Sequence, residues 1–206
     1  MRSSLLGYGR QLGLIAAAAT LVAASVAAPA AQVNAPAVGT ENFGKVNENY
    51  YRGGQPRGGQ YEELRRLGVR TVIDLRRDSA RDEPGAVRAA GMRYFNIPLE
   101  ASRPATDEQT AEFLRLVNDP GNWPVYVHCK GGRHRTGALT AVYRIAHDGW
   151  TAEQAFREML QYDFDNSVFG GGGRARQKKF VFDYYERHAA EKANAGGKAQ
   201  NGTQNQ

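Results

Sequence analysis

Short apolar runs alternate with helical patterns of apolar and polar residues through the middle of the chain. Runs rich in β-branched and aromatic residues predict strands at 71–75, 94–97 and 125–128. Helical patterns predict helices at 60–67, 83–90, 138–146, 152–159 and 181–188. Two capping boxes, beginning at Thr106 and Thr151, mark the starts of helices. This alternation favours an α/β fold with a mostly parallel central sheet and helices on both faces.

The first 31 residues differ from the rest of the chain. Two arginines precede an uncharged, alanine-rich run at 12–28, and Ala28-Pro29-Ala30 matches the small-residue pattern of a cleavage site. This order predicts a signal peptide over residues 1–30. A membrane-spanning helix is the alternative, but a span needs about 20 strongly apolar residues. We therefore expect a periplasmic or secreted mature protein that begins near Ala31 and has no stable membrane span.

Composition divides the remaining chain into three parts. Residues 31–41 are rich in Ala, Pro, Asn and Gly, and are expected to form a linker. Residues 191–206 contain few apolar side chains, so a disordered tail is predicted there. A single folded domain is expected over residues 42–190, because a chain of 206 residues suits one core better than two.

Charge and cysteine content restrict the possible functions. Without residues 1–30, 25 basic and 21 acidic residues remain, so the net charge is +4. This modest excess, without a long basic run, does not indicate a nucleic-acid partner, and we expect a monomer. Cys129 is the only cysteine in the sequence, so it cannot form an internal disulfide. It is either a small buried apolar residue or a reactive thiol.

The segment around Cys129 favours the reactive thiol. A strand leads into it, Gly131 and Gly132 follow in a short loop, and a helix begins near Arg135. Backbone N–H groups in a loop before a helix N-terminus stabilise a thiolate, and they also bind phosphate oxygens. Glycines allow the backbone to turn tightly beside the ligand. The planar guanidinium of Arg135 can bind two phosphate oxygens and follow their charge into the transition state.

Other residues of the loop have predicted roles beside this pair. His128 is expected to orient the loop through its ring nitrogens, and Thr136 to donate a hydrogen bond to the sulfur. Lys130, Arg133 and His134 could add positive charge around the same phosphate, although solvated loop charges would give the same pattern. The predicted phosphate-binding set is Lys130, Gly131, Gly132, Arg133, His134, Arg135 and Thr136.

The loop from His128 to Gly137 resembles the signature of protein tyrosine and dual-specificity phosphatases. It is most similar to the atypical dual-specificity phosphatases of plants and fungi and their bacterial relatives. Segments 51–56, 71–76 and 118–124 resemble the same group, although 51–56 predicts only a turn packed on the sheet. The resemblance implies a cysteine-phosphatase fold and hydrolysis of phosphate monoesters through a phosphocysteine intermediate. It implies no cofactor, and some relatives with this kind of loop act on inositol pyrophosphates.

The family also implies a general acid, and here the sequence departs from the usual pattern. Dual-specificity enzymes usually have an aspartate about thirty residues before the cysteine, where this chain has Glu100. Asp107 is the alternative, but a capping box already explains an acid in the first turn of a helix. Glu100 is therefore the predicted general acid, with Asp107 left open.

Alternative functions have weaker support from the sequence. A rhodanese-like sulfurtransferase also has a cysteine after a strand, but it needs neither Arg135 nor Thr136. A phosphate-binding module without activity would not need both Cys129 and Arg135. No cluster of Asp, His and Glu in the sequence indicates a metal site. The expected substrate is a phosphorylated protein or a small polyphosphorylated molecule.

Overall fold

The computed structural model describes residues 38–78, 81–165 and 171–202. The predicted signal peptide and residues 31–37 of the predicted linker lie outside these residues. Val38, at the start of the described chain, is 3% exposed and packs in a cluster with Tyr51 and Leu64. The folded domain therefore includes the end of the segment that was predicted as a linker. Within the described part, no helix is long and apolar enough to cross a membrane.

Strands and helices alternate as predicted along the domain. The elements are β1 (Gly44–Asn47), β2 (Tyr50–Gly53), α1 (Gln60–Arg66), β3 (Thr71–Arg76), α2 (Glu83–Ala89), β4 (Arg93–Leu99), α3 (Asp107–Asn118), a 3-10 turn (Pro120–Asn122), β5 (Val125–His128), α4 (Arg135–Asp148), α5 (Ala152–Gln161) and α6 (Gly171–Gly202). Both capping boxes are present, because the hydroxyl oxygens of Thr106 and Thr151 accept hydrogen bonds from the backbone N–H groups of Gln109 and Gln154. The predicted helix starts are thus confirmed.

The five strands form one sheet in the order β1-β2-β5-β3-β4. β2, β5, β3 and β4 are parallel to one another, and only the edge strand β1 runs antiparallel, against β2. The mostly parallel α/β fold is therefore confirmed. The central strand, β5, carries Cys129 at its carboxyl end, which is where ligands bind in sheets of this kind.

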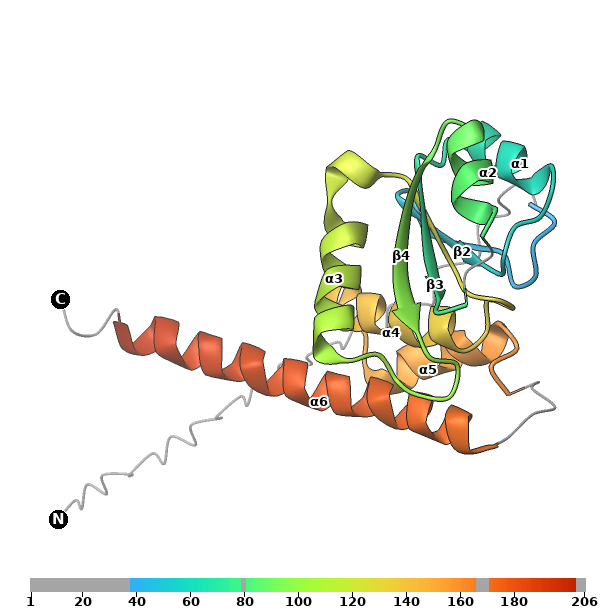
Figure 1. Cartoon of the computed structure of the whole chain (residues 1–206). Helices are drawn as coiled ribbons and strands as arrows, with labels where there is room; N and C mark the ends of the chain where they lie inside the picture. The colour runs from blue at the N-terminus through green and yellow to red at the C-terminus, as the bar shows by residue number, and fades with distance from the viewer. Residues whose placement is uncertain (1–37, 79–80, 166–170, 203–206) are drawn as a thin grey trace, which may run out of the picture. The chain divides into compact units, whose positions relative to one another are not determined.

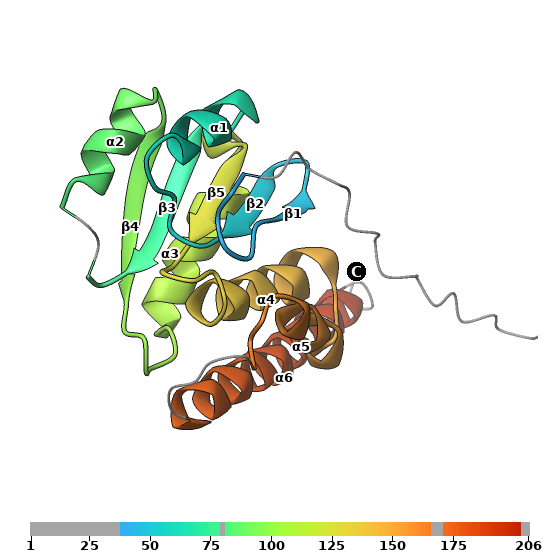
Figure 2. The same cartoon turned by 90° about the vertical axis from the view of Figure 1, so that its right-hand side faces the viewer.

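Helices cover both faces of the sheet (Figures 1 and 2). On one face, α1 and α2 pack on side chains that include Val72 and Tyr126. On the other face, α3, α4, α5 and α6 pack on side chains that include Ile73, Val125 and Val127. Neighbouring residues of a strand point to opposite faces, so β3 and β5 contribute to both clusters. Their near-continuous apolar sequences result from burial on both sides.

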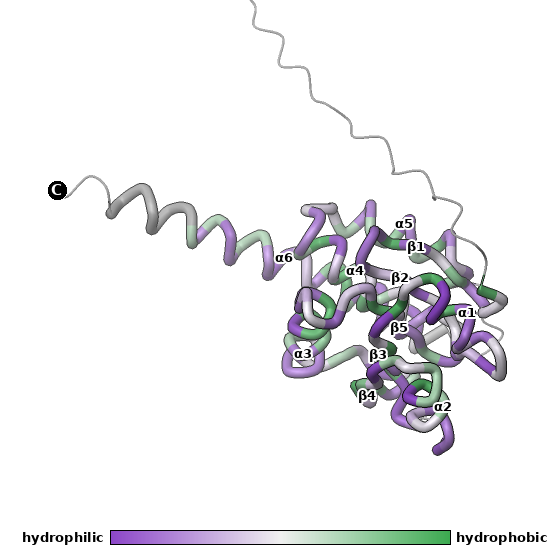
Figure 3. The backbone as a smooth tube through the Cα atoms, turned by 90° about the horizontal axis from the view of Figure 1, so that it is seen from above, coloured by the Kyte–Doolittle hydropathy of each residue, from purple (hydrophilic) through white to green (hydrophobic). Residues whose placement is uncertain are grey.

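Two parts of the fold differ from the sequence prediction. Residues 51–56 were predicted as a turn, whereas Tyr50–Gly53 form β2 and pair with β5. Residues 191–206 were predicted as a disordered tail, whereas α6 continues to Gly202, and residues 203–206 lie outside the described residues. Alanine, glutamate and lysine are strong helix formers, and they are frequent between 189 and 195. In the part of α6 that is coloured in Figure 3, hydrophobic residues are interspersed among hydrophilic ones.

Candidate active site

Cys129 lies directly after β5, at the start of a loop that ends where α4 begins at Arg135. Its side chain is 4% exposed and borders the larger core cluster. Helix α4 forms because apolar residues such as Leu139 and Val142 bury one side of it, and it ends at Gly149 in the left-handed conformation. The first N–H groups of this helix have no partner within the helix, so they can bind an anion.

The carbonyl groups of three successive loop residues are held by other segments of the chain. Lys130 O accepts a hydrogen bond from Gln55 N at 3.1 Å, and Gly131 O accepts one from Asn42 Nδ2 at 2.8 Å. Gly132 O accepts one from Arg52 Nη2 at 2.5 Å. In a planar trans peptide the N–H points opposite to the C=O. The N–H groups of the next three residues therefore point away from these partners, as a phosphate-binding loop requires.

The two loop glycines have different roles. Gly132 has a φ of 68°, and a Cβ there would lie 2.6 Å from the carbonyl carbon of Gly53 and 2.7 Å from Gly54 N. Gly131 has no positive φ, and the nearest atom to a Cβ would be Glu41 Oε2 at 3.4 Å. Only Gly132 is therefore required for the close approach between the loop and the segment after β2. That segment is held in turn by Tyr126, whose hydroxyl donates to Gly54 O at 2.6 Å.

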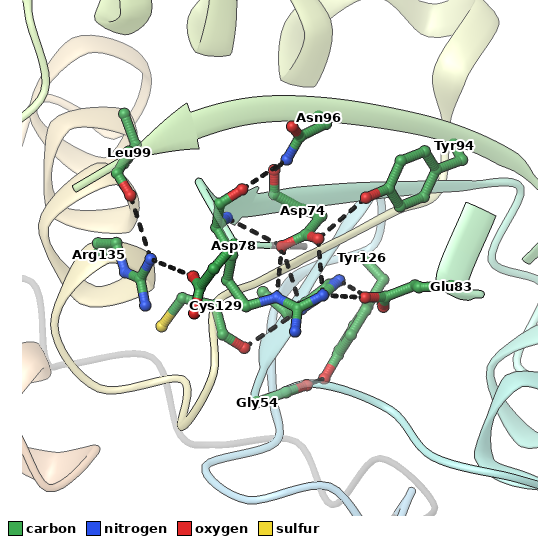
Figure 4. A network of polar contacts seen from close by, with 12 residues as sticks. Gly54, Asp74, Asp78, Glu83, Tyr94, Asn96, Leu99, Tyr126, Cys129 and Arg135 are labelled. Carbon is green, nitrogen blue, oxygen red and sulfur yellow. Dashed lines mark hydrogen bonds and ion pairs between the residues drawn. The ribbon is translucent and has the colours of Figure 1, made fainter. Parts of the chain in front are cut away.

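Arg135 is buried, and its guanidinium is held beside the loop. Nη1 donates a hydrogen bond to Leu99 O at 3.1 Å and lies 3.9 Å from an oxygen of Asp78 (Figure 4). The contact with Leu99 fixes the arginine against the end of β4 and leaves its other nitrogens for phosphate. Thr136 is also buried, but its hydroxyl has no hydrogen-bond partner within the described chain. Its predicted bond to the sulfur is therefore absent from this structure.

A network of buried polar side chains lies beside the carboxyl end of β5 (Figure 4). Arg76 contacts Asp74 through two bonds of 2.8–2.9 Å and also bonds Glu83. His128 Nε2 lies 3.1 Å from Glu83 Oε1, and Nδ1 lies 3.2 Å from Cys129 O. Burial alone would raise the pKa of Asp74, but the hydrogen bonds from Arg76 and the positive charges of His128 and Arg76 together hold that pKa below its usual range. The ring of His128 thus lies between Glu83 and the backbone carbonyl of Cys129, and its orienting role stays a prediction.

The same network contains a group of metal-ligand residues that the sequence did not reveal. Asp74, Glu83 and His128 each offer a ligand atom within 4.8 Å of the others. However, Arg76 hydrogen-bonds both carboxylates, so its guanidinium already supplies the positive charge between them. A divalent cation among these ligands would be repelled by that charge. The residues therefore fit a charge-balanced network better than a metal centre.

The predicted loop cations have different environments. Lys130 is exposed. Arg133 lies 3.3 Å from Glu41 and 4.0 Å from Asp163, so these acids offset its positive charge. His134 is turned toward Phe164, whose carbonyl oxygen lies 3.0 Å from Nε2. Burial and the neighbouring arginines lower the pKa of His134, although the contact with the Phe164 carbonyl opposes this, so the ring is mostly neutral near pH 7.

Neither predicted acid lies in a fully buried position. Glu100 directly follows Leu99 and lies 2.6 Å from Arg77 and 3.4 Å from Arg103. Asp107 lies 3.2 Å from Arg187 of α6 and is 84% exposed, which agrees with a structural role at the start of α3.

The sequence prediction missed a third carboxylate, that of Asp78, which the structure places beside Arg135. Asp78 lies just beyond the carboxyl end of β3, the strand that pairs with β5. The rule that sites form beyond strand ends was the available signal for it.

This geometry is that of the cysteine-dependent phosphatase fold, in which one strand–loop–helix segment holds both nucleophile and phosphate. Residues 28–183 match the family model described as "DSP-PTPase phosphatase fused to NAD+ Kinase", and the chain belongs to this family. The dual specificity protein phosphatase TpbA of Pseudomonas aeruginosa is 32% identical over 123 residues, which cover 60% of this chain and 55% of TpbA. The inositol diphosphatase DSP3 of Arabidopsis thaliana is 29% identical over 108 residues, covering 50% and 53%.

Solved structures agree with this assignment. A cysteine-to-serine variant of TpbA in complex with phosphotyrosine has a TM-score of 0.61 at 26% identity, covering 78% of this chain and 97% of that one. The catalytic domain of the Saccharomyces cerevisiae phosphatase Siw14 has a TM-score of 0.63 at 22% identity, covering 77% and 94%, and supports the fold alone. OCA1 of the fungus Mycosarcoma maydis is 34% identical over 110 residues, covering 50% of this chain and 68% of that one, so relatives from bacteria, plants and fungi are confirmed. The chain spans about half the length of TpbA and DSP3.

Proposed function

We propose that this protein is a metal-independent phosphatase that hydrolyses phosphate monoesters through a phosphocysteine on Cys129. The observation that carries the proposal is the orientation of the loop. Three successive carbonyls are bound from outside, so the N–H groups that follow face the side where a phosphate would lie. Arg135 stands at the first position of α4 and closes the same anion site.

Two steps account for the reaction. The Cys129 thiolate attacks phosphorus, the S–P bond forms, and the bond to the leaving oxygen breaks as that oxygen takes a proton from a carboxylic acid. Water then attacks phosphorus, gives a proton to the resulting carboxylate, and releases phosphate and the thiolate. Arg135 and the loop N–H groups bind the phosphate oxygens in both transition states and stabilise the negative charge on those oxygens.

The test is phosphate release from para-nitrophenyl phosphate by the mature protein with and without a chelator. We expect undiminished wild-type activity with the chelator, and loss of activity in both Cys129→Ser and Arg135→Ala. Circular dichroism of each variant controls for folding. Turnover by Cys129→Ser equal to wild type, or loss of wild-type turnover with the chelator, contradicts the proposal. Thiocyanate formation in place of phosphate release would support the sulfurtransferase alternative.

Glu100 is the proposed general acid. Glu100 directly follows Leu99, whose carbonyl oxygen accepts a hydrogen bond from Arg135. The backbone of Glu100 therefore borders the proposed phosphate site. Its ion pairs with Arg77 and Arg103 are exposed, and exposed pairs contribute little to stability. The Glu100 side chain can therefore leave these arginines and turn toward a bound substrate. Asp107 has its own partner on α6.

We further propose that small, multiply phosphorylated molecules are preferred over phosphotyrosine peptides. Lys130 is exposed at the loop, and an open hollow of about 330 Å³ is lined by Phe164, Arg174 and Lys178. The hollow adjoins the loop, because the ring of Phe164 packs edge-to-face on that of His134. Further phosphates within about 8 Å of these cations would still feel their charge at physiological salt. The name of DSP3, an inositol diphosphatase, supports this preference, while the TpbA complex with phosphotyrosine supports the alternative.

The decisive measurement is kcat/KM for an inositol polyphosphate relative to a phosphotyrosine peptide. We expect the ratio to exceed one in the wild type and to fall in Lys130→Ala/Arg133→Ala. The matched control is Lys179→Ala, since Lys179 is exposed and pairs with Asp183 on α6. A wild-type preference for the peptide, or an unchanged ratio in the double variant, contradicts the substrate proposal and leaves the phosphatase proposal intact.

Export is also proposed, and its support is the pattern of residues 1–30: a charged start, an uncharged alanine-rich run and a small-residue cleavage pattern. The protein would then act in the periplasm or outside the cell.

A further inference from the structure

Arg52 is a fully buried arginine outside the Cys129–Arg135 segment. It lies on β2, within the 51–56 segment for which the sequence predicted only a turn. In the parallel pairing of β2 with β5, Arg52 is opposite Val127, and Gly53 is opposite His128. The side chain of Arg52 therefore leaves the sheet beside the end of the catalytic strand.

The guanidinium of Arg52 lies beneath the catalytic loop. Nη2 donates to Gly132 O at 2.5 Å, and the guanidinium carbon stacks over the ring of Tyr162 at 3.8 Å from its centroid. A Cβ on Gly137, in the first turn of α4, would lie 3.9 Å from Nη2. One side chain thus contacts the loop, the start of the helix and the aromatic ring that follows α5.

Burial of the charged Arg52 side chain is energetically unfavourable. Nε and Nη1 are buried without a hydrogen-bond partner in the described chain, and burial of unpaired donors is unfavourable. The positive end of α4 lies nearby, which adds to that cost. Burial lowers the pKa of Arg52, while Glu158, Tyr162, Tyr50 and Cys129 in their negative forms would raise it. Because a guanidinium keeps its proton in proteins, a fixed cation remains at this position.

The carboxylate of Glu158 does not hydrogen-bond Arg52. It bonds Arg144 instead, with its oxygens at 2.6–3.3 Å from the guanidinium nitrogens. Besides the exposed acids Glu41, Asp78 and Asp163, which lie beside Arg133 and Arg135, the anions expected at the loop are the Cys129 thiolate and a bound phosphate. A cation beneath the loop stabilises both, since Coulomb interactions between buried groups are only weakly screened.

We propose that Arg52 is a positioning residue for the phosphatase reaction, which holds Gly132 in the phosphate-binding orientation and places a buried positive charge beside the Cys129 thiolate. The inference rests on the proposed function and extends it to a residue 77 positions before the nucleophile. Arg52 acts through the loop and need not touch the substrate. Both parts of the role, the hydrogen bond and the charge, can be separated by substitution.

The experiment compares Arg52→Met and Arg52→Lys with the wild type. The rate of inactivation by iodoacetate at pH 6 and pH 9 measures how much of Cys129 is present as the thiolate. The values of kcat and KM for para-nitrophenyl phosphate measure whether the loop keeps its phosphate-binding geometry. We expect Arg52→Met to be inactivated about tenfold more slowly at pH 6 and at a similar rate at pH 9, where free thiols are largely ionised. We expect its kcat to fall by about 100-fold, because a small misplacement of the loop has effects of that order.

Arg52→Lys keeps the charge but lacks the planar fork, so we expect wild-type inactivation at pH 6 with a reduced kcat. The control is Leu64→Ala, which creates a cavity on the opposite face of the sheet. It should lower the melting temperature while leaving inactivation and kcat unchanged.

Equal inactivation and kcat in Arg52→Met and the wild type would overturn the inference. Should Arg52→Met fail to fold, Arg52→Lys decides, and a wild-type kcat in that variant overturns the positioning role. Turnover that persists in Cys129→Ser is a failure of the proposed function instead, so the two failures are distinguishable.

Discussion

Gly132→Ala is expected to destabilise the protein and disrupt the loop, whereas Gly131→Ala is not. The two glycines are neighbours in the same loop, yet only Gly132 has a positive φ, of 68°. A Cβ at Gly132 would approach the backbone of Gly53 and Gly54 to within 2.6–2.7 Å, a distance at which the backbone must shift. At Gly131 the closest atom would be 3.4 Å away, at the end of the exposed side chain of Glu41.

The magnitude follows from these two contributions. The left-handed conformation costs an alanine about 1–2 kcal/mol relative to glycine. Forcing a methyl group into a packed position costs typically about 1–3 kcal/mol. Together they predict that Gly132→Ala lowers the free energy of unfolding by about 2–5 kcal/mol. Gly131→Ala meets neither penalty and restricts the unfolded chain, so its effect should lie within about 1 kcal/mol.

Urea unfolding of both variants measures their free energies of unfolding. The value of kcat/KM for para-nitrophenyl phosphate measures whether the loop keeps its phosphate-binding geometry. We expect Gly132→Ala to lose about 100-fold in kcat/KM, because the N–H groups that bind phosphate shift with the loop. Gly131→Ala serves as the control at the adjacent position. Equal losses in the two variants, or a loss of less than about 1 kcal/mol in Gly132→Ala, would refute the reasoning.

Three further predictions concern the acid, the N-terminus and the buried network. Glu100→Gln should slow hydrolysis of substrates with poor leaving groups by about 10²–10⁴-fold and of aryl phosphates far less, and the same pattern in Asp107→Asn alone would contradict the assignment. N-terminal sequencing of the secreted protein should find a start near Ala31; an intact leader on cytoplasmic protein would contradict export. Asp74→Asn should lower the free energy of unfolding by about 3–5 kcal/mol at pH 7, because Arg76 loses a buried partner. Since the folded pKa of Asp74 is depressed, its contribution is present above about pH 3.9 and is lost as the pH falls through the folded pKa, which pH-dependent urea unfolding can follow; a constant difference down to pH 2 would contradict this.

The features that the sequence predicted correctly are those encoded within a few neighbouring residues. Strands β3 and β5 are short runs of β-branched and aromatic residues, and the capping boxes of α3 and α5 each occupy four positions. Cys129 and Arg135, the predicted nucleophile and phosphate clamp, are also six residues apart, so a single loop joins them. Local patterns of this kind do not require knowledge of the tertiary structure.

The features that the sequence missed depend on contacts between distant segments. The bond from Arg52 to Gly132 joins residues 80 positions apart, and Asp78 meets Arg135 only because β3 pairs with β5. Such contacts cannot be derived from periodicity. His134 was predicted as an added cation, but burial against Phe164 makes the neutral ring more favourable, and no local pattern signals that burial.

The catalytic strand has a different support on each side. β2 and the residues after it bind the loop carbonyls, through Arg52 and Gln55, and so determine which way the N–H groups face. β3 contributes Asp74 and Arg76, which hold the network that contacts His128. Substitutions on the β2 side should therefore change loop geometry and catalysis, whereas substitutions on the β3 side should act first on folding stability. Because β5 lies between these two strands in the sheet order, one strand–loop–helix segment receives both kinds of support at its carboxyl end.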